Sequence, residues 1–302
     1  MIRINFTEPC TTVWKKWREK CTTEQATLNG VYAAGKSGKV SGKLYRERKD
    51  LYFALEGPFH GKCAYCETLI VVSHPGDLDH FRPKGRVTKF SGTVTLKDKR
   101  GRDVPHPGYY WLAYDFRNLL PSCEDCNRPN KARSGGLRIG KWDLFPVKGS
   151  YYAENPGEEK LEKPLLINPT DKKIKIEKHL TVDDKGVVTF HTDKGETCCK
   201  VFGLNDRQAL VQERMVAYRN GYHAVLNFFV ARGNDNVTGA EINLKTIIEY
   251  EAGISPYSAA GRSGIDAMCK KLGVDKNSII PKMTIKRRKS SPKEKRSHGR
   301  EP

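Results

Sequence analysis

The chain has 302 residues, of which 37% are hydrophobic and 29% charged, and its formal net charge at pH 7 is +19. This composition excludes an intrinsically disordered protein, because disordered chains lack the apolar residues that build a core. No apolar run approaches the ~20 residues needed to span a bilayer, and the first residues lack the pattern of a secretory signal. We therefore expect a cytoplasmic protein with no membrane partner.

Positive charge is spread over the whole chain. Residues 286–300 hold eight Lys or Arg and one Glu, so a net charge of +12 remains on the other residues. A surplus of this size favours polyanionic partners and salt-dependent binding. Solubility or a membrane-surface patch would also account for the charge, but no amphipathic basic helix accompanies it. We expect nucleic acid as the partner, and the charge alone leaves DNA, tRNA and other RNA open.

The first two thirds of the chain predict short elements. Residues 10–34 have a moderate amphipathic pattern that is compatible with a helix. In residues 92–104, apolar and polar residues alternate before a charged, glycine-containing turn. This pattern indicates an exposed hairpin. Two β-rich runs on either side of Asp183–Gly186 predict a second hairpin.

The last third of the chain predicts helices. Apolar residues recur at three and four positions up to about Gly233, and Asn205 is expected to cap the start of this long helix. A second helix over residues 241–251 and a third after Pro256 should pack on it. The tail over residues 281–302 is basic and low in apolar residues, so it is expected to be disordered.

Nine cysteines in a chain without an export signal argue against a disulfide framework. Four of them form two CxxC pairs separated by 56 residues, which exceeds the gap of a simple zinc ribbon. A redox dithiol would need only one pair, whereas two pairs supply the four thiolates of a structural, tetrahedral Zn²⁺ site. The predicted zinc ligands are Cys63, Cys66, Cys123 and Cys126. The other five, Cys10, Cys21, Cys198, Cys199 and Cys269, are predicted to be reduced and mostly packing residues.

The dipeptide Asp79-His80 stands between the two cysteine pairs. A neutral imidazole can activate water near pH 7, and a carboxylate is an oxygen ligand that Mg²⁺ prefers. Neighbours on a strand point to opposite faces, so both side chains reach one site only if the strand ends there. Pro83 is compatible with such an ending.

Two asparagines accompany the second cysteine pair. Asn127 follows the last cysteine, and successive helical residues are turned by ~100°, so it is expected to face away from the zinc. Asn118 precedes an apolar pair, and its amide is suited to holding a loop through hydrogen bonds to the backbone. An ordinary turn residue is the alternative for Asn118.

The order CxxC, Asp-His, Asn, CxxC-Asn resembles the zinc-knuckle branch of the HNH (ββα-metal) endonucleases, over about residues 58–146. The resemblance implies an α+β protein in which a β-hairpin and a helix hold one divalent metal against a scissile phosphate. It makes His80 the general base, Asp79 and Asn127 the ligands of the catalytic metal, and Asn118 the residue that positions the histidine loop. Asn127 stands where the family pattern has His, which favours Mg²⁺ or Mn²⁺.

A narrower resemblance covers most of residues 60–220. The words CAYCE, DHFRPKGRV, YYWLAYDFRNLLPSC, WDLFPV, LLINPTD and FGLNDRQALVQERM are similar to HNH proteins encoded with retrons and with the Septu antiphage system. In that system the HNH protein is the effector, or B component, and an ABC-type or SMC-like ATPase is the A component. The resemblance implies an endonuclease of antiphage defence with an ATPase partner, and in a retron also a reverse transcriptase and its msDNA.

Basic and aromatic residues surround the candidate site. Residues 79–102 hold eight basic and two acidic side chains. The expected contacts to the nucleic-acid backbone are Arg82, Lys84, Arg86, Arg128 and Lys131. For each one a solvated surface position is the alternative. The aromatic cluster Tyr109, Tyr110, Trp111 and Tyr114 is interpreted as core in preference to base stacking.

These features predict an HNH core with a zinc knuckle of four cysteines, small hairpins and a mainly helical C-terminal region. The alternative function is a zinc-stabilised nucleic-acid-binding subunit without catalysis. In chain order we expect an N-terminal helical segment and loop, the nuclease domain, a Pro-rich connection with a hairpin, a helical region suited to docking a partner, and the basic tail. Their bounds are 1–57, 58–147, 148–195, 196–280 and 281–302.

Overall fold

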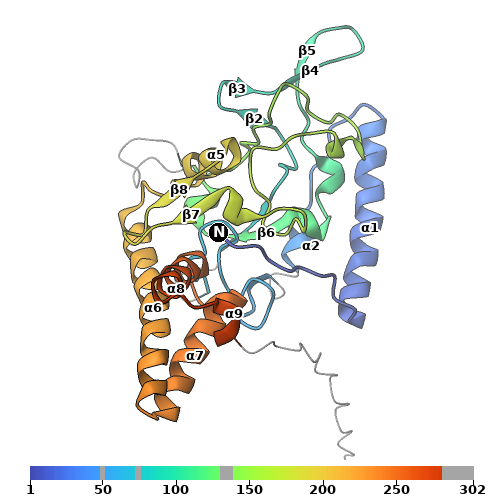
Figure 1. Ribbon diagram of the computed structural model, residues 1–302. Helices are drawn as coiled ribbons and strands as arrows, with labels where there is room; N and C mark the ends of the chain where they lie inside the picture. The colour runs from blue at the N-terminus through green and yellow to red at the C-terminus, as the bar shows by residue number, and fades with distance from the viewer. Residues whose placement is uncertain (48–51, 72–75, 130–138, 281–302) are drawn as a thin grey trace, which may run out of the picture.

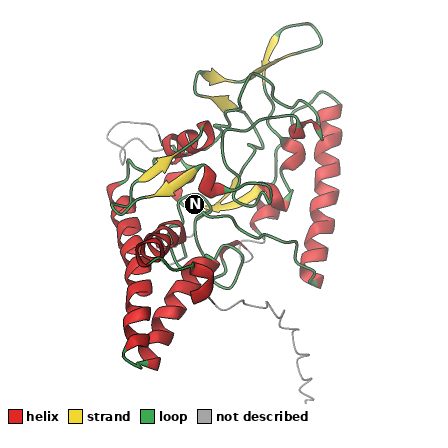
Figure 2. Cartoon of the chain, in the orientation of Figure 1, coloured by secondary structure: helices red, strands yellow, loops and turns green. Residues whose placement is uncertain are grey.

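The computed structural model describes residues 1–47, 52–71, 76–129 and 139–280 (Figure 1). The predicted disordered tail and the predicted contact Lys131 lie outside these residues. Long helices gather at one end of the molecule, helix α1 runs along the opposite side, and small sheets lie between them (Figure 2). Within the described residues, no helix is both long enough and apolar enough to cross a membrane.

Helix α1 spans Thr12–Ala33 and confirms the helix predicted over residues 10–34. The side chain of Thr11 accepts a hydrogen bond from the Trp14 backbone N–H at 3.2 Å, which caps the first turn. Its buried residues recur at helical spacing and form the face that packs on the core: Trp14, Trp17, Cys21 and Leu28. Short helical turns follow in the chain, at α2 (Gly42–Arg46), η1 (Tyr110–Leu112), η2 (Phe116–Asn118), η3 (Glu158–Lys160) and η4 (Ile176–Lys178).

Three hairpins extend from the central part of the chain. Strands β4 (Thr95–Lys97) and β5 (Asp103–Pro105) pair antiparallel in a projecting hairpin, as predicted (Figure 1). The second predicted hairpin is also confirmed, by β7 (Leu180–Val182) and β8 (Val188–Phe190). A further pair, β2 (Thr88–Lys89) and β3 (Gly92–Thr93), was not predicted, because strands of two residues leave no alternating pattern.

The candidate site is built on one small antiparallel sheet. Strand β1 (Asp77–His80) pairs with β6 (Leu119–Ser122), so that Asp79 lies opposite Leu120 and His80 opposite Leu119. All four residues of β6 are buried, and helix α4 (Glu124–Asn127) follows it directly. These three elements bring the two cysteine pairs to one place, although 56 residues separate them in the chain.

The C-terminal helices form a packed group. Their bounds are α5 (Asp193–Phe202), α6 (Gln208–Gly233), α7 (Val237–Ala252), α8 (Ser258–Leu272) and α9 (Lys276–Ile279). The predicted packing of the second and third helices on the long one is confirmed. Helices α6 and α8 approach closely because Gly221 and Gly264 lack side chains: a Cβ on either one would strike backbone of the other helix.

The predicted cap at Asn205 is wrong. Helix α6 begins three residues later, at Gln208, and Arg207 occupies the N-cap position. The Asn205 amide instead accepts a hydrogen bond from the Val188 N–H at 2.9 Å and donates to the Val188 carbonyl at 2.8 Å. An amide that satisfies both backbone groups of a strand residue holds β8 in place and is no longer free to cap a helix.

One cluster of buried apolar side chains runs from Phe6 to Ile279. The aromatic residues predicted to be core are confirmed there, since Tyr109, Trp111 and Tyr114 are buried. Their neighbour Tyr110 stacks on Tyr32 of helix α1, with ring centroids 3.6 Å apart. Base stacking by this group is therefore excluded for its buried members.

Candidate metal and catalytic site

The four predicted zinc ligands form one cluster. The Sγ atoms of Cys63, Cys66, Cys123 and Cys126 all lie within 4.8 Å of one another. Tetrahedral Zn–S bonds of ~2.3 Å place sulfurs ~3.8 Å apart, so the cluster fits zinc. A backbone hydrogen bond of 2.9 Å from the Ala64 N–H to the Pro121 carbonyl joins the two knuckles. The four cysteines can therefore hold a structural zinc ion and join β6 and α4 to the turn before β1.

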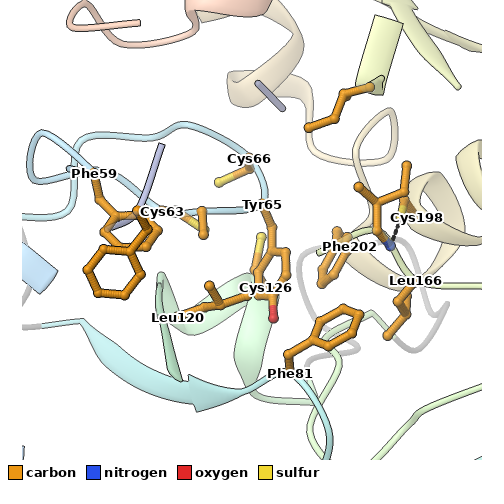
Figure 3. Packing of buried hydrophobic residues seen from close by; sticks show 14 of the residues in the cluster. Phe59, Cys63, Tyr65, Cys66, Phe81, Leu120, Cys126, Leu166, Cys198 and Phe202 are labelled. Carbon is orange, nitrogen blue, oxygen red and sulfur yellow. Dashed lines mark hydrogen bonds between the residues drawn. The ribbon is translucent and has the colours of Figure 1, made fainter. Parts of the chain in front are cut away.

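The other five cysteines form no such group. All nine cysteines are free thiols, and those outside the cluster are buried except for Cys10, which is exposed. Burial raises the pKa of Cys198 to about 12. This thiol accepts a hydrogen bond from the Ile167 N–H at 3.3 Å (Figure 3). Because four of these five cysteines are buried, the prediction that they are mostly packing residues is confirmed.

An arginine from the C-terminal region reaches the cysteine cluster. The Arg207 guanidinium lies 3.9 Å from Cys123 Sγ and 3.4 Å from Cys126 Sγ, and 3.5 Å from the Asp125 carboxylate. Burial disfavours its charge, but the cysteines outweigh burial and raise the pKa of Arg207. Four thiolates around Zn²⁺ leave a net charge of −2, so a buried cation there stabilises the centre. The sequence analysis did not identify Arg207.

Asp79 is buried at the end of β1, and each of its carboxylate oxygens has a partner. Oδ2 accepts a hydrogen bond from the Tyr65 hydroxyl at 2.6 Å, and Oδ1 lies 3.1 Å from the Lys141 ammonium. Tyr65 lies between Cys126 and Phe202, whose ring stacks on it at 4.1 Å (Figure 3). Burial raises the pKa of Asp79, and the Lys141 charge and the Tyr65 hydroxyl oppose that rise. The carboxylate is therefore fixed in direction by two buried groups.

Lys141 is the second buried charge of the site, with no exposed surface. Its ammonium also donates to the His80 carbonyl at 2.6 Å, and its backbone N–H donates to the Cys126 carbonyl at 2.8 Å. Burial lowers the pKa of Lys141, while the Asp79 carboxylate opposes that change. One residue thus ties the end of β1 to helix α4.

His80 ends strand β1, and hydrogen bonds identify its tautomer. Nε2 lies 2.9 Å from the Ala113 carbonyl oxygen, which can only accept, so Nε2 carries the proton. Nδ1 is then the basic atom, and the Lys84 ammonium approaches it at 3.4 Å. Burial and the Lys84 charge hold the pKa of His80 well below its usual range, so the ring is neutral at neutral pH. The Tyr45 ring contacts it edge to face, with centroids 5.0 Å apart.

Asn118 is buried and holds the loop after the histidine. Its Oδ1 accepts a hydrogen bond from the Arg82 N–H at 2.8 Å, and its Nδ2 donates to the carbonyls of Arg82 at 3.0 Å and Leu112 at 3.2 Å. Strand β1 ends at His80. The next residue, Phe81, donates its N–H to the Asn118 carbonyl at 2.8 Å. Asn118 therefore fixes the backbone two residues beyond His80.

Asn127 lines the same cavity as Asp79 and His80. This cavity has a volume of about 340 Å³ and is also bordered by Lys84 and Arg86. The Asn127 Nδ2 donates to the Asp77 carboxylate at 2.9 Å, which leaves the amide oxygen as the end available to a ligand. The structure thus brings together three of the four predicted catalytic side chains at one cavity, with Asn118 supporting the loop beside it.

The predicted backbone contacts divide into two groups. Lys84 and Arg86 line the cavity, and Arg86 also forms an ion pair of 2.6 Å with Asp143, a cavity residue that the sequence analysis did not identify. Arg82 instead turns away: it pairs with the buried Glu162 carboxylate at 2.9 Å. Its guanidinium also lies over aromatic rings of the core.

Arg128 is exposed, and it also pairs with carboxylates of this chain. Its Nε and Nη2 lie 2.9 and 3.0 Å from the two oxygens of Asp77, and its Nη1 lies 2.8 Å from Glu124. The guanidinium forks of Arg82 and Arg128 are thus occupied by carboxylates of this chain. For this reason we no longer expect a phosphate contact from either residue.

Comparison with known proteins gives two curated relatives. Over 163 residues the chain is 37% identical to the Septu protein PtuB of Bacillus mycoides (strain KBAB4), which covers 53% of this chain and 48% of PtuB. It is 31% identical over 163 residues to the Septu protein PtuA of the same strain, which covers 53% of this chain and 20% of PtuA. The chain is related to Septu proteins over about half its length. It spans about half the length of PtuB and a fifth of PtuA, and no family model and no solved structure matches it.

Proposed function

We propose that this chain is a metal-dependent HNH endonuclease that hydrolyses phosphodiester bonds of nucleic acid, with DNA favoured, as the effector of a Septu-type antiphage system. The observation that carries the proposal is the state of His80. Its ring is neutral, its proton is fixed on Nε2, and its Nδ1 lies in a cavity shared with Asp79, Asn127 and two cations. A general base of this kind needs an unprotonated nitrogen within reach of water.

The donor atoms at the cavity fit a hard cation. Each oxygen of Asp79 accepts one hydrogen bond and keeps a second lone pair, and the Asn127 amide oxygen is a neutral oxygen ligand. Mg²⁺ is commonly held by one or two protein oxygens together with substrate phosphates. A bound Mg²⁺ or Mn²⁺ would offset the charge that develops on the phosphate in the transition state. The cation would contact Asp79 and Asn127.

The side chains of the site divide the remaining work. His80 Nδ1 takes a proton from the attacking water, while the Nε2–H stays hydrogen-bonded to the Ala113 carbonyl, which stabilises the imidazolium that forms. Lys84 and Arg86 hold the phosphate at the cavity. Asn118 keeps the loop after His80 in one position through its three backbone hydrogen bonds.

The relatives also support a proposal about partners. Because the chain resembles both PtuB and PtuA, we propose that it acts in a complex with an ATPase subunit, and in a retron with a reverse transcriptase and its msDNA. Co-expression of the chain with a Septu A-component ATPase tests the complex. One co-eluting species is expected, and two separately eluting proteins would contradict the assignment.

Cleavage of plasmid DNA and of tRNA, with and without added Mg²⁺, tests the activity. The assay uses the chain by itself and in complex with the ATPase, since the partner is part of the proposal. His80→Ala is expected to abolish metal-dependent cleavage, because no other histidine lines this cavity among the described residues. His223→Ala, an exposed histidine of helix α6, is the matched control and should cleave normally. Normal cleavage by His80→Ala would contradict the proposal, and binding without cleavage in every arm would favour a non-catalytic binding subunit.

A further inference from the structure

Trp142 differs from the other tryptophans of the chain. Trp14, Trp17 and Trp111 are buried, with 1, 2 and 7% of their surface exposed, whereas Trp142 is 51% exposed. Burial of apolar surface therefore accounts for the first three and accounts for only half of Trp142. A large aromatic side chain left in solvent at a cavity indicates a contact surface.

The backbone of Trp142 is also held in an unfavourable conformation. Its φ of +47° lies in the left-handed region, which bulky residues rarely adopt. The flanking hydrogen bonds enforce it: the Trp142 N–H donates to the Asn127 carbonyl at 2.7 Å, and the Lys141 N–H to the Cys126 carbonyl at 2.8 Å. Thr88 N–H donates to the Asp143 carbonyl at 2.8 Å on the other side. Such strain persists where the surroundings fix it, and it is concentrated at functional sites.

The position of Trp142 matches the layout of a nucleotide. It lines the cavity that contains His80, Lys84 and Arg86. His80 is the proposed general base, and Lys84 and Arg86 are cations for a phosphate. The indole of Trp142 presents an apolar face next to them. Among the exposed aromatic side chains that the structure describes, Trp142 is the one at this cavity, since Phe90, Tyr151 and Phe190 lie elsewhere.

We propose that Trp142 is a stacking platform for an unpaired base of the nucleic-acid strand that enters the His80 cavity. The inference rests on the proposed function for the identity of the strand and adds the form in which it is recognised. Bases in a duplex already stack on their neighbours, so the indole selects a single-stranded or flipped-out nucleotide. Every base has a π face, so the platform accepts deoxyribo and ribo strands alike. Trp142 acts as a binding residue and takes no part in proton transfer.

Intrinsic fluorescence in Mg²⁺-free buffer tests this directly, because Trp142 is the exposed emitter. Titration with oligo(dT) or oligo(U) should quench the emission of the wild-type chain, and a duplex of the same length should not. Trp142→Phe should remove the quenching and retain most of the affinity. Trp142→Ala should bind the single strands about 10-fold more weakly, as expected for the loss of one stacked base. Phe190→Ala, which removes an exposed aromatic side chain of β8, should bind as the wild type does.

The outcomes separate this inference from the nuclease proposal. Equal affinity of Trp142→Ala and the wild type for single strands, or equal quenching by duplex, would overturn the stacking role even if His80-dependent cleavage is observed. Quenching and weaker binding without any cleavage would support the platform and overturn the nuclease. Zinc content near that of the wild type checks that each variant is folded. Quenching by only one of the two oligonucleotides would overturn the claim that the platform accepts both sugars.

Discussion

The cysteine cluster and the His80 cavity share helix α4, yet they differ in which of their atoms already have partners. In the cluster, four thiols face one another and Arg207 supplies a cation, so the group is closed to any further ligand once zinc is bound. In the cavity, the Asn127 amide oxygen remains available, and His80 Nδ1 is approached by the Lys84 ammonium at 3.4 Å. Cys126 and Asn127 are neighbours on helix α4, and one is fully buried while the other lines the cavity. Consecutive residues of one short helix therefore belong to the cysteine cluster and to the cavity.

The largest effect is expected at the closed centre. Cys126→Ser should lose bound zinc and most of the stability of the fold, since structural zinc contributes apparent binding energies of ~10 kcal/mol or more to small domains. Zinc content by mass spectrometry and the thermal unfolding midpoint measure the change. Cys269→Ser, at a buried thiol outside the cluster, is the control and should keep its zinc. A Cys126→Ser chain with full zinc content would show that the cluster is not a zinc site.

The next effect tests the buried ion pair between the two regions. Lys141→Met leaves the Asp79 carboxylate buried without its cation, and breaking a buried pair in this way costs about 3–5 kcal/mol of unfolding free energy. Urea denaturation measures it. The double variant Asp79→Asn with Lys141→Met should recover part of the loss, because no unpaired charge remains. Equal destabilisation in the single and double variants would show that the pair is not coupled.

A third prediction concerns pH and a histidine outside the site. His106 donates from Nε2 to the Ala153 carbonyl at 2.9 Å and accepts the Gly108 N–H on Nδ1 at 2.9 Å, so its ring is neutral in the fold. Burial lowers the pKa of His106, and the unfolded chain therefore binds this proton more readily. The unfolding free energy should fall as the pH drops below ~6.5, by at most ~1.4 kcal/mol per pH unit for this group.

His106→Asn provides the comparison for that pH dependence. The variant is expected to be less stable at every pH and to lose stability less steeply below pH ~6.5 than the wild type, because one titrating group is absent. Urea denaturation at several pH values gives the two slopes. Identical slopes would contradict the depressed pKa of His106.

The smallest predicted effect distinguishes the basic residues of the cavity from those that are paired elsewhere. Lys84→Gln should lower the slope of log affinity against log salt by about 1, as expected for the loss of one phosphate contact. Arg128→Gln should leave the slope unchanged, because Asp77 and Glu124 already occupy that guanidinium. Fluorescence anisotropy in Mg²⁺-free buffer measures both. A larger change for Arg128→Gln would reverse the assignment.

The cysteine cluster and the residues Asp79, His80 and Asn127 could be predicted from the sequence because their signals are local. Two CxxC pairs predict a zinc site from their spacing alone. Asp79, His80 and Asn127 stand at recognisable intervals from these pairs. The α1 helix and two hairpins were equally predictable from periodicity. Each of these signals is a pattern within a few residues, and the resemblance over residues 58–146 relates the distant ones to one another.

The residues that were not predicted reach the site from distant parts of the chain. Lys141 lies 62 positions from Asp79, and Arg207 lies 81 positions from Cys126, so neither forms a motif with its partner. Each is one of 54 Lys and Arg residues, and in so basic a chain a single cation carries no signal. The partner of Arg82, Glu162, is likewise 80 positions away and gives no local signal. Only the packed fold shows which charges are already paired.

The separation of the two regions is the central claim, and Asn127→Ala tests it most directly. Zinc content, thermal midpoint and Mg²⁺-dependent cleavage are measured on one preparation of this variant. We predict wild-type zinc content and a nearly unchanged midpoint, with cleavage reduced at least ~10-fold, the scale of effect expected for groups around a metal. Unchanged cleavage would show that the amide takes no part in the site, and a loss of zinc together with cleavage would show that the two regions are not separable.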